Sequence, residues 1–340
     1  MTFEEIPLSE IQAAEAPATE REHRERGLWR DAFRDLRRKR SAAVGLAILA
    51  VLVLLAVFAP IIAPYGEREV LIESEGLRPR AEPCIHVNVD WIPNVPVLEQ
   101  LENFLHANGF SCPSSEPQHL MGLDGNGRDV FSRILYGARI SLLAGAVAVS
   151  FAVVVGTALG LAAGYVGGRF DNVVMRAMDV FLAFPALLLA IAIVTARGPG
   201  LFNAIIAVSI VTIPVYARVV RSRVLSVREQ DFVAADRALG VSNARIVLHR
   251  VLPNSLTPLV VQATLGIATA VLELAALSFV GLGGDPDQAE WGRMLALERN
   301  QLFTSPHLVF YPGVMIMLNV LAFNLIGDGL RDALDPRLNR

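Results

Sequence analysis

Six long runs without a charged residue dominate the pattern of this chain. They are 41–63, 140–166, 180–196, 198–217, 251–272 and 308–327. A helix needs about 20 predominantly apolar residues to cross a bilayer, so each run can span one or nearly span one. The runs are apolar on every face, whereas the strands of a membrane β-barrel alternate apolar and polar residues. The sequence therefore predicts an all-α integral membrane protein with six transmembrane helices.

Composition and motif content exclude most other classes. Hydrophobic residues make up 53% of the chain and charged residues 19%, outside the range of soluble proteins. The only lysine, Lys39, belongs to no Gly-Lys-Ser/Thr motif, so no phosphate-binding loop for ATP is predicted. The HExxH, CxxC and Gly-x-Ser-x-Gly patterns are missing too. We therefore expect a translocation pathway or a membrane scaffold rather than an enzyme, with no cofactor, metal or nucleic acid bound by this chain.

Arginine indicates which side of the membrane each segment faces. The N-terminal tail ends in a cluster of arginines, so the positive-inside rule places it in the cytoplasm. Six spans return the C-terminus to the cytoplasm and put the arginine-rich loop before the fifth span there as well. We predict a multi-pass protein of a bacterial or archaeal plasma membrane, its basic cluster resting on membrane lipid. Its parts are the cytoplasmic tail 1–40, the first helix 41–63, an extracytoplasmic insertion 64–121, a five-helix core 122–327 with the cytoplasmic loop 221–254, and the cytoplasmic tail 328–340.

The insertion holds the only two cysteines, Cys84 and Cys112. A disulfide between them is predicted, because the segment faces an oxidising compartment. In the chain-entropy model it would stabilise the fold by roughly 3 kcal/mol. A zinc site with His86, His106 and His119 is the alternative, although the spacing matches no compact ligand pattern.

Two further helices are expected outside the spans. Residues 97–108 of the insertion are predicted to form a short helix. Residues 122–139 are predicted to form an amphipathic helix lying on the outer membrane surface, because Val130 and Ile134 share an apolar face while Arg133 lies off it.

The loop between the fourth and fifth spans has the pattern of two short helices joined by a turn. Asp231 is predicted to cap a helix over 232–239, and Gly240 to end that helix in a left-handed conformation. Ser242 then caps a second helix, which Pro253 stops.

The first loop helix carries small residues that would let a partner approach its backbone closely. Phe232 and Leu239 are predicted to form an apolar stripe beside them at i and i+7. The pattern favours a docking knob and a plain basic loop about equally. The small residues are Ala234, Ala235 and Ala238.

Polar and helix-breaking residues within the spans give further candidates. Glu273 is the one carboxylate inside a long apolar run, so it should face a partner or a water-filled cavity, or serve only in helix packing. Asp179 is expected to pair with Arg176 at i−3. Pro185 and Pro214 predict kinks. Close helix contacts are predicted at Gly145, Gly156, Gly160 and Gly164.

Several sequence blocks together resemble one family. They are GLDGNGRDVFSR (122–133), DVFLAFP (179–185), FVAADRALG (232–240), LSFVGLG (277–283), EWGRM (290–294) and LAFNLIGDGLRDALDP (321–336). In this order they resemble the second, C-type, permease subunit of the dipeptide/oligopeptide ABC importers, and 232–240 resembles the family's EAA loop. The resemblance covers roughly 34–63 and nearly all of 122–340.

The resemblance implies the type I ABC-importer permease fold and a set of partners. These are a second homologous permease, two cytosolic ATPases that bind ATP and magnesium, and an extracytoplasmic substrate-binding protein. This chain would then form half of a pathway for dipeptides or oligopeptides, driven by ATP hydrolysis in the partner subunits. The loop residues implied in ATPase coupling are Phe232, Ala235, Asp236, Leu239, Gly240, Ser242 and Arg245.

The sequence departs from the family in two places. The Glu-Ala-Ala of the family stands here as Ala234-Ala235-Asp236, so the acidic group lies about 200° further round the helix, and the salt bridge of the family glutamate does not carry over. The insertion 64–120 has no counterpart. The alternative function is the same machinery for nickel, an oligosaccharide or a peptide antibiotic, and the alternative class is a scaffold that recruits a cytosolic partner.

Overall fold

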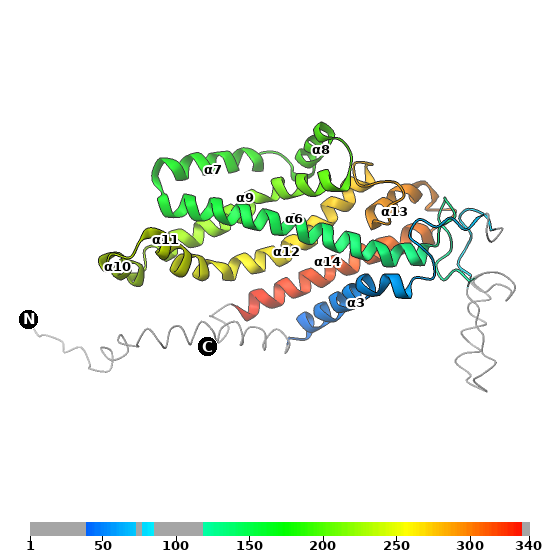
Figure 1. Cartoon of the computed structure of the whole chain (residues 1–340), viewed down its shortest axis with the longest axis horizontal. Helices are drawn as coiled ribbons and strands as arrows, with labels where there is room; N and C mark the ends of the chain where they lie inside the picture. The colour runs from blue at the N-terminus through cyan, green and yellow to red at the C-terminus, as the bar shows by residue number, and fades with distance from the viewer. Residues whose placement is uncertain (1–38, 73–76, 85–117, 335–340) are drawn as a thin grey trace, which may run out of the picture.

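The computed structural model describes residues 39–72, 77–84 and 118–334. Within them the regular structure is helical apart from two isolated bridges, and most long helices run along one axis (Figure 1). The long helices are α3 (Arg40–Ile62), α6 (Val130–Val166), α7 (Gly168–Leu182), α8 (Ala186–Arg197), α9 (Leu201–Val227), α12 (Leu252–Phe279) and α14 (His307–Ala333). The short elements are α10 (Asp231–Ala238), α11 (Asn243–Ile246), a π turn (Val247–Val251), α13 (Trp291–Glu298) and a 3₁₀ turn (Arg299–Gln301).

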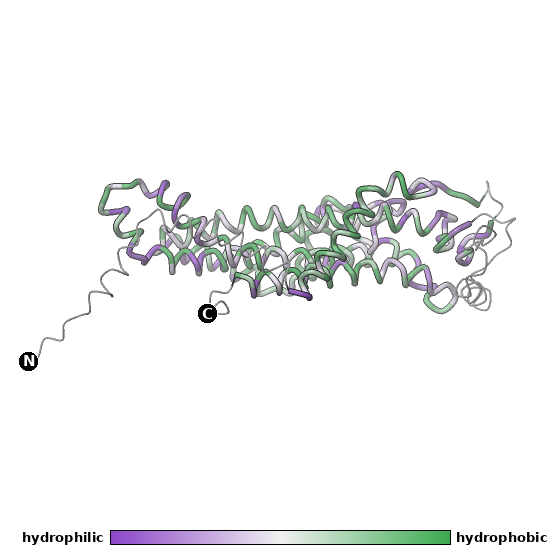
Figure 2. The backbone as a smooth tube through the Cα atoms, turned by 90° about the horizontal axis from the view of Figure 1, so that it is seen from below, coloured by the Kyte–Doolittle hydropathy of each residue, from purple (hydrophilic) through white to green (hydrophobic). Residues whose placement is uncertain are grey.

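Five helices of the described chain are long and apolar enough to cross a membrane. They are α3, α6, α9, α14 and the continuous helix Asn243–Phe279. Hydrophobic residues fill most of the middle of the bundle and hydrophilic residues gather toward its two ends (Figure 2). The predicted all-α membrane architecture is confirmed. Below, the end that carries α10 is called the α10 end and the opposite one the α13 end.

The third predicted span is not one straight helix. It is shared between α7, with 15 residues, and α8, with 12 residues, which are each too short to cross a bilayer alone and meet at 90°. Pro185 directly precedes α8, and a proline disfavours helical backbone in the residue before it, here Phe184. The kink predicted at Pro185 is confirmed, and the single helix predicted over 180–196 is wrong.

Glycines bring α6 against its neighbours. A Cβ on Gly160 would lie 2.5 Å from the carbonyl oxygen of Ala217 in α9, and Gly156 and Gly164 have equally close neighbours on α9. A Cβ on Gly145 would collide with a side chain of α12. The predicted close contacts at these glycines are confirmed, and they make α6 the central helix that α9 and α12 cover.

The surface helix predicted over 122–139 is wrong. Residues before Val130 form a turn closed by a bridge between Leu123 and Asp129. The Asp129 carboxylate accepts a bond from the backbone N–H of Ser132 at 2.7 Å and so caps α6. From Val130 the helix continues unbroken into the second span, and Arg133, expected on its polar side, is fully buried.

The second loop helix does not stop at Pro253. The π turn joins α11 to α12, and in it the N–H of Leu252 bonds to the carbonyl of Val247, five residues earlier. Proline has no N–H to donate and is tolerated near the start of a helix, where Pro253 stands in α12. The wider turn therefore carries the chain past the proline into the fifth span.

Two apolar clusters hold the bundle together. One joins α6, α8, α9 and α12 and extends under α10 and α11, and the other joins α3, α6, α13 and α14. Helix α14 packs against both α3 and α12, and α13 against α12 and α14. A Cβ on Gly45 would lie 2.8 Å from the carbonyl of Ala322, so α3 and α14 touch backbone to backbone.

Candidate functional site

A knob formed by residues 231–246 projects at the α10 end, where it comprises α10, the following turn and α11 (Figure 1). Val233 and Ile246 are fully buried beneath it, and Phe232 packs on the same cluster. Leu239 is 81% exposed, so Phe232 and Leu239 do not form the predicted stripe. The outer face of α10 is made of small exposed residues, namely Ala234, Ala235 and Ala238.

The turn of the knob has the backbone expected for its glycine. Gly240 has φ +75°, and its N–H donates to the carbonyl of Arg237 at 3.0 Å. The predicted left-handed end of the helix is confirmed. Asp231, predicted to cap α10, is instead its first residue and follows the N-cap Gln230. Ser242 is the N-cap of α11, but its side chain makes no capping bond.

Three side-chain contacts fasten the knob to the spans. The Tyr165 hydroxyl at the end of α6 donates to Asn243 Oδ1 at 2.7 Å, and the guanidinium of Arg237 stands 5.7 Å from the centre of the Tyr165 ring. Arg250 Nε donates to Asp236 Oδ2 at 3.0 Å. The displaced acidic residue Asp236 is therefore engaged inside this chain, while Arg245 lies exposed in α11.

Sequence reasoning missed Tyr165 and Arg250 as parts of this site. Tyr165 lies 78 residues from Asn243, and no local pattern connects the two. The sequence pattern explains Arg250 only as one of the positive charges that place this loop in the cytoplasm. Only the packing of α6 beside α11 could reveal the contact.

Ion pairs at the same end fasten α7 to α9. Asp179 pairs with Arg218, so the predicted pairing of Asp179 with Arg176 is wrong. Asp171 accepts two bonds from the guanidinium of Arg221.

Glu273 lies on α12 and is partly exposed. Its Oε2 atom is buried without a hydrogen-bond partner in the described part of the chain. Thr269, one turn earlier on the same face, is exposed. Glu273 thus lies at the edge of the bundle with unmet hydrogen-bonding capacity.

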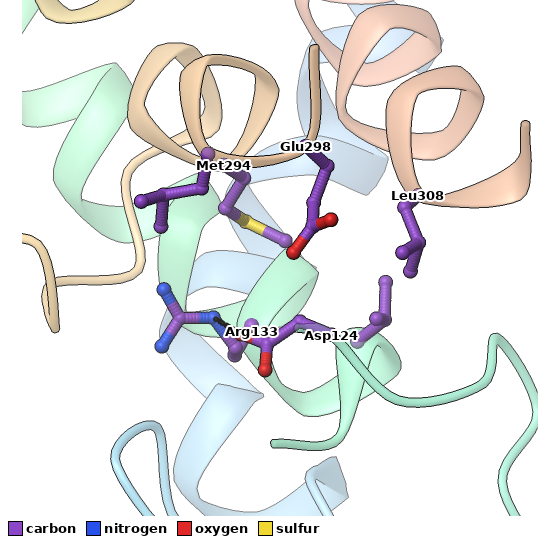
Figure 3. A pocket seen from close by; sticks show the side chains of 7 residues that line it. Asp124, Arg133, Met294, Glu298 and Leu308 are labelled. Carbon is purple, nitrogen blue, oxygen red and sulfur yellow. Dashed lines mark ion pairs between the residues drawn. The ribbon is translucent and has the colours of Figure 1, made fainter. Parts of the chain in front are cut away.

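A buried cluster of charges occupies the α13 end. Asp124, Arg133 and Glu298 face a cavity of about 10 Å³, which is room for one water, with Met294 and Leu308 beside it (Figure 3). Arg133 Nε stands 3.4 Å from Asp124 Oδ2. This cluster was also missed, because a pattern read as an amphipathic surface helix places Arg133 in solvent.

Arg133 binds two separate segments to the start of α6. Its Nη1 donates to the carbonyls of Glu67 at 2.8 Å and Asp287 at 3.1 Å, and its Nη2 to the carbonyl of Gln288 at 3.3 Å. One side chain therefore joins the segment after α3 and the segment before α13 to α6.

Glu290 and Trp291 dock α13 on the bundle. The Glu290 carboxylate accepts the N–H groups of Gly292 and Arg293 at 2.9 Å each and so caps α13. Burial raises the pKa of Glu290, while these bonds act the other way. Trp291 Nε1 donates to the carbonyl of Ile134 in α6 at 3.1 Å.

The predicted cysteine site is only partly within the described residues. Cys84 exchanges two backbone hydrogen bonds with His119, at 2.8 and 3.0 Å. Cys112, His86, His106 and the helix predicted at 97–108 lie outside the described residues, so the disulfide and its zinc alternative stay predictions. Among the described residues no group of three or more His, Cys, Asp or Glu is arranged to hold a metal ion.

Comparison with known proteins gives two family matches. Residues 156–340 match the family described as "Binding-protein-dependent transport system inner membrane component". Residues 27–74 match the "N-terminal TM domain of oligopeptide transport permease C". Together the two matches cover the knob, the bent pair, the later spans and the first span.

Curated relatives extend the similarity over most of the chain. The chain is 45% identical to the dipeptide transport system permease protein DppC of Alkalihalophilus pseudofirmus, over 91% of this chain and 90% of that protein. It is 45% identical to the di/tripeptide transport system permease protein DppC of Pseudomonas aeruginosa, over 73% and 82%. It is 40% identical to the glutathione transport system permease protein GsiD of Escherichia coli O6:K15:H31, over 91% of each.

Proposed function

Because this chain belongs to the family of binding-protein-dependent transport system inner membrane components, as a C-type permease of an ABC importer, we propose that it carries short peptides inward. The named relatives support this cargo, since their names specify dipeptides, di/tripeptides and glutathione. The chain would form half of the pathway beside a second homologous permease. Two cytosolic ATPases would bind ATP and magnesium, and an extracytoplasmic protein would deliver the peptide.

The knob is the observation that supports transport driven by partner ATPases. A helix whose outer face is alanine lets another protein approach its backbone closely. Its base is fixed to α6 through Tyr165 and to the π turn through Arg250, so a push on α10 moves the spans rather than the loop alone. The residues that would contact an ATPase are Ala234, Ala235, Ala238, Leu239 and Arg245, all exposed.

The proposed orientation follows from the same element. An ATPase supplied with cytosolic ATP requires the α10 end, with the start of α3 and the end of α14, to face the cytoplasm. Paired arginines gather at this end, on α9 and the knob, as the positive-inside rule requires. The α13 end, with the segment that contains Cys84, then faces outward.

Uptake by the reconstituted complex tests the function. The chain, its partner permease, the ATPases and the binding protein are placed in proteoliposomes, and labelled dipeptide is offered on the outside. We expect accumulation that requires both ATP inside and the binding protein outside. ATP-driven uptake of nickel or an oligosaccharide in place of peptide would replace the proposed cargo. A complex that assembles and hydrolyses ATP but moves no solute would favour the scaffold.

Glu273 is proposed as a pathway residue, and Glu273→Gln is expected to lower peptide uptake about tenfold while assembly survives. The buried, unpartnered carboxylate oxygen calls for water, a partner chain or the solute, because a bare charge in hydrocarbon costs several kcal/mol. Glutamine keeps the shape and removes the charge. The effect is measured as labelled dipeptide uptake per assembled complex. Thr269→Val, which adds apolar surface on the same face of α12, is the control and should transport like the parent. A Glu273→Leu variant that transports like the parent would remove this residue from the pathway.

A further inference from the structure

A groove of about 510 Å³ opens at the α10 end between three spans. Helix α12 packs against both α9 and α14 and forms the floor, while α9 and α14 supply the two walls. The volume lies within the range of small-molecule sites. The groove lies apart from the knob, and it shares no lining residue with it.

Two unpaired arginines line this groove, Arg223 from α9 and Arg331 from α14. Both are exposed, and neither has an ion pair among the described residues. Their neighbours differ, since Arg218 and Arg221 on α9 are each paired with an aspartate and Asp332 beside Arg331 is paired with Lys39. Two positive charges that have no ion pair within the described residues therefore line one concave site, which favours an anionic ligand.

Apart from Thr257 and Gln262 the rest of the lining is apolar, and part of it lies deeper along the spans. On α9 the groove is lined by Val219, one turn closer to the middle of the bundle than Arg223. On α12 it is lined by Val261 and Leu265, which lie between the start of the helix and its middle. The site thus has positive charge at the membrane boundary and apolar walls toward the membrane interior.

We propose that this groove binds an anionic phospholipid, with the phosphate between Arg223 and Arg331 and an acyl chain along Val219, Val261 and Leu265. Basic pockets between transmembrane helices at the cytoplasmic side bind acidic headgroups. In this groove the positive charges lie where the headgroup of a phospholipid would be, and the apolar walls lie where its acyl chain would be. Thr257, the polar lining residue one turn nearer the start of α12 than Val261, is placed to bond the headgroup or glycerol oxygens. The assignment to the cytoplasmic leaflet rests on the proposed orientation.

Lipid titration followed by native mass spectrometry tests the site. The full-length chain, purified in mild detergent with the subunits that accompany it, is titrated with dioleoyl phosphatidylglycerol or with dioleoyl phosphatidylcholine. We expect preferential binding of phosphatidylglycerol, weakened about fivefold by Arg223→Gln or Arg331→Gln and more than about twentyfold by both. Lysine at both positions should restore most of the affinity. The matched control is Arg169→Gln with Arg176→Gln, two exposed arginines of α7 outside the groove, which should bind like the parent.

A second variant separates the groove from the charges. Val261→Trp fills the apolar part, keeps both arginines and should also weaken phosphatidylglycerol binding. Equal binding of the two lipids by the parent, or unchanged preference in the double glutamine variant, would overturn the proposal. Displacement of the lipid by excess dipeptide would assign the groove to the solute instead. The measurement needs no transport, so it succeeds or fails independently of the peptide-import proposal.

Discussion

Gly240→Pro should abolish peptide uptake while leaving the membrane spans folded. Gly240 has φ +75°, whereas the proline ring holds φ near −65°, and the substitution also removes the N–H that donates to the Arg237 carbonyl. The turn must therefore change and α10 must tilt away from the position that Val233 and Tyr165 fix. We expect uptake per complex to fall more than about tenfold, since misplacing the turn costs on the order of 1–3 kcal/mol. ATP hydrolysis should either continue without transport or lose its response to the binding protein.

A matched series distinguishes backbone strain from a lost surface. Apart from its two chain neighbours, no atom of the described residues lies within 4 Å of a Cβ built on Gly240, so a side chain has room there and only the backbone angle is tested. Gly240→Asn should keep most of the uptake, because asparagine tolerates the left-handed region better than other residues with a side chain. Gly240→Val should resemble proline. Normal uptake by the proline variant, at parental expression, would show that the knob does not couple ATPase and pathway.

The sequence sufficed for elements whose causes are local. Charge-free runs located five spans, since a helix in lipid must satisfy its own backbone and be apolar on its outside. Gly240 indicated the turn of the knob, because left-handed backbone favours glycine, and Gly160 indicated the contact with α9, because a Cβ there would meet the carbonyl of Ala217.

The errors arose where a distant segment decides the outcome. The sequence pattern predicts Arg133 at the surface. In the structure its guanidinium instead donates to the carbonyls of Glu67 and Asp287, which belong to two other segments. Asp179 has an arginine at i−3, but a better-placed one comes from α9. Pro253 normally ends a helix, yet a π turn before it lets the helix continue. Helical periodicity contains no information about any of these partners.

Replacing the buried Arg133 should be the most destabilising single change at the α13 end. Its side chain is 0% exposed, and its guanidinium satisfies three backbone carbonyls and stands beside the Asp124 carboxylate. Arg133→Met keeps the length and removes every donor, leaving the carbonyls of Glu67, Asp287 and Gln288 without this partner, while Asp124 keeps its ion pair with Arg128 at 2.8 Å. Hydrogen bonds to a charged group contribute about 1.5–3 kcal/mol each, so losing this set should cost several kcal/mol. We expect a lower unfolding temperature in detergent and a smaller yield of assembled complex.

Arg139→Met is the matched control, because Arg139 lies on the same helix and is exposed, so its loss should leave the unfolding temperature nearly unchanged. Arg133→Lys is the informative intermediate. Lysine keeps the positive charge beside Asp124 but lacks the planar fork that reaches the Glu67 and Gln288 carbonyls together, so its stability should fall between parent and methionine. Equal unfolding temperatures for Arg133→Met and Arg139→Met would contradict this prediction. They would show that apolar contacts, and not the hydrogen bonds of Arg133, hold the segments before α6 and α13 in place.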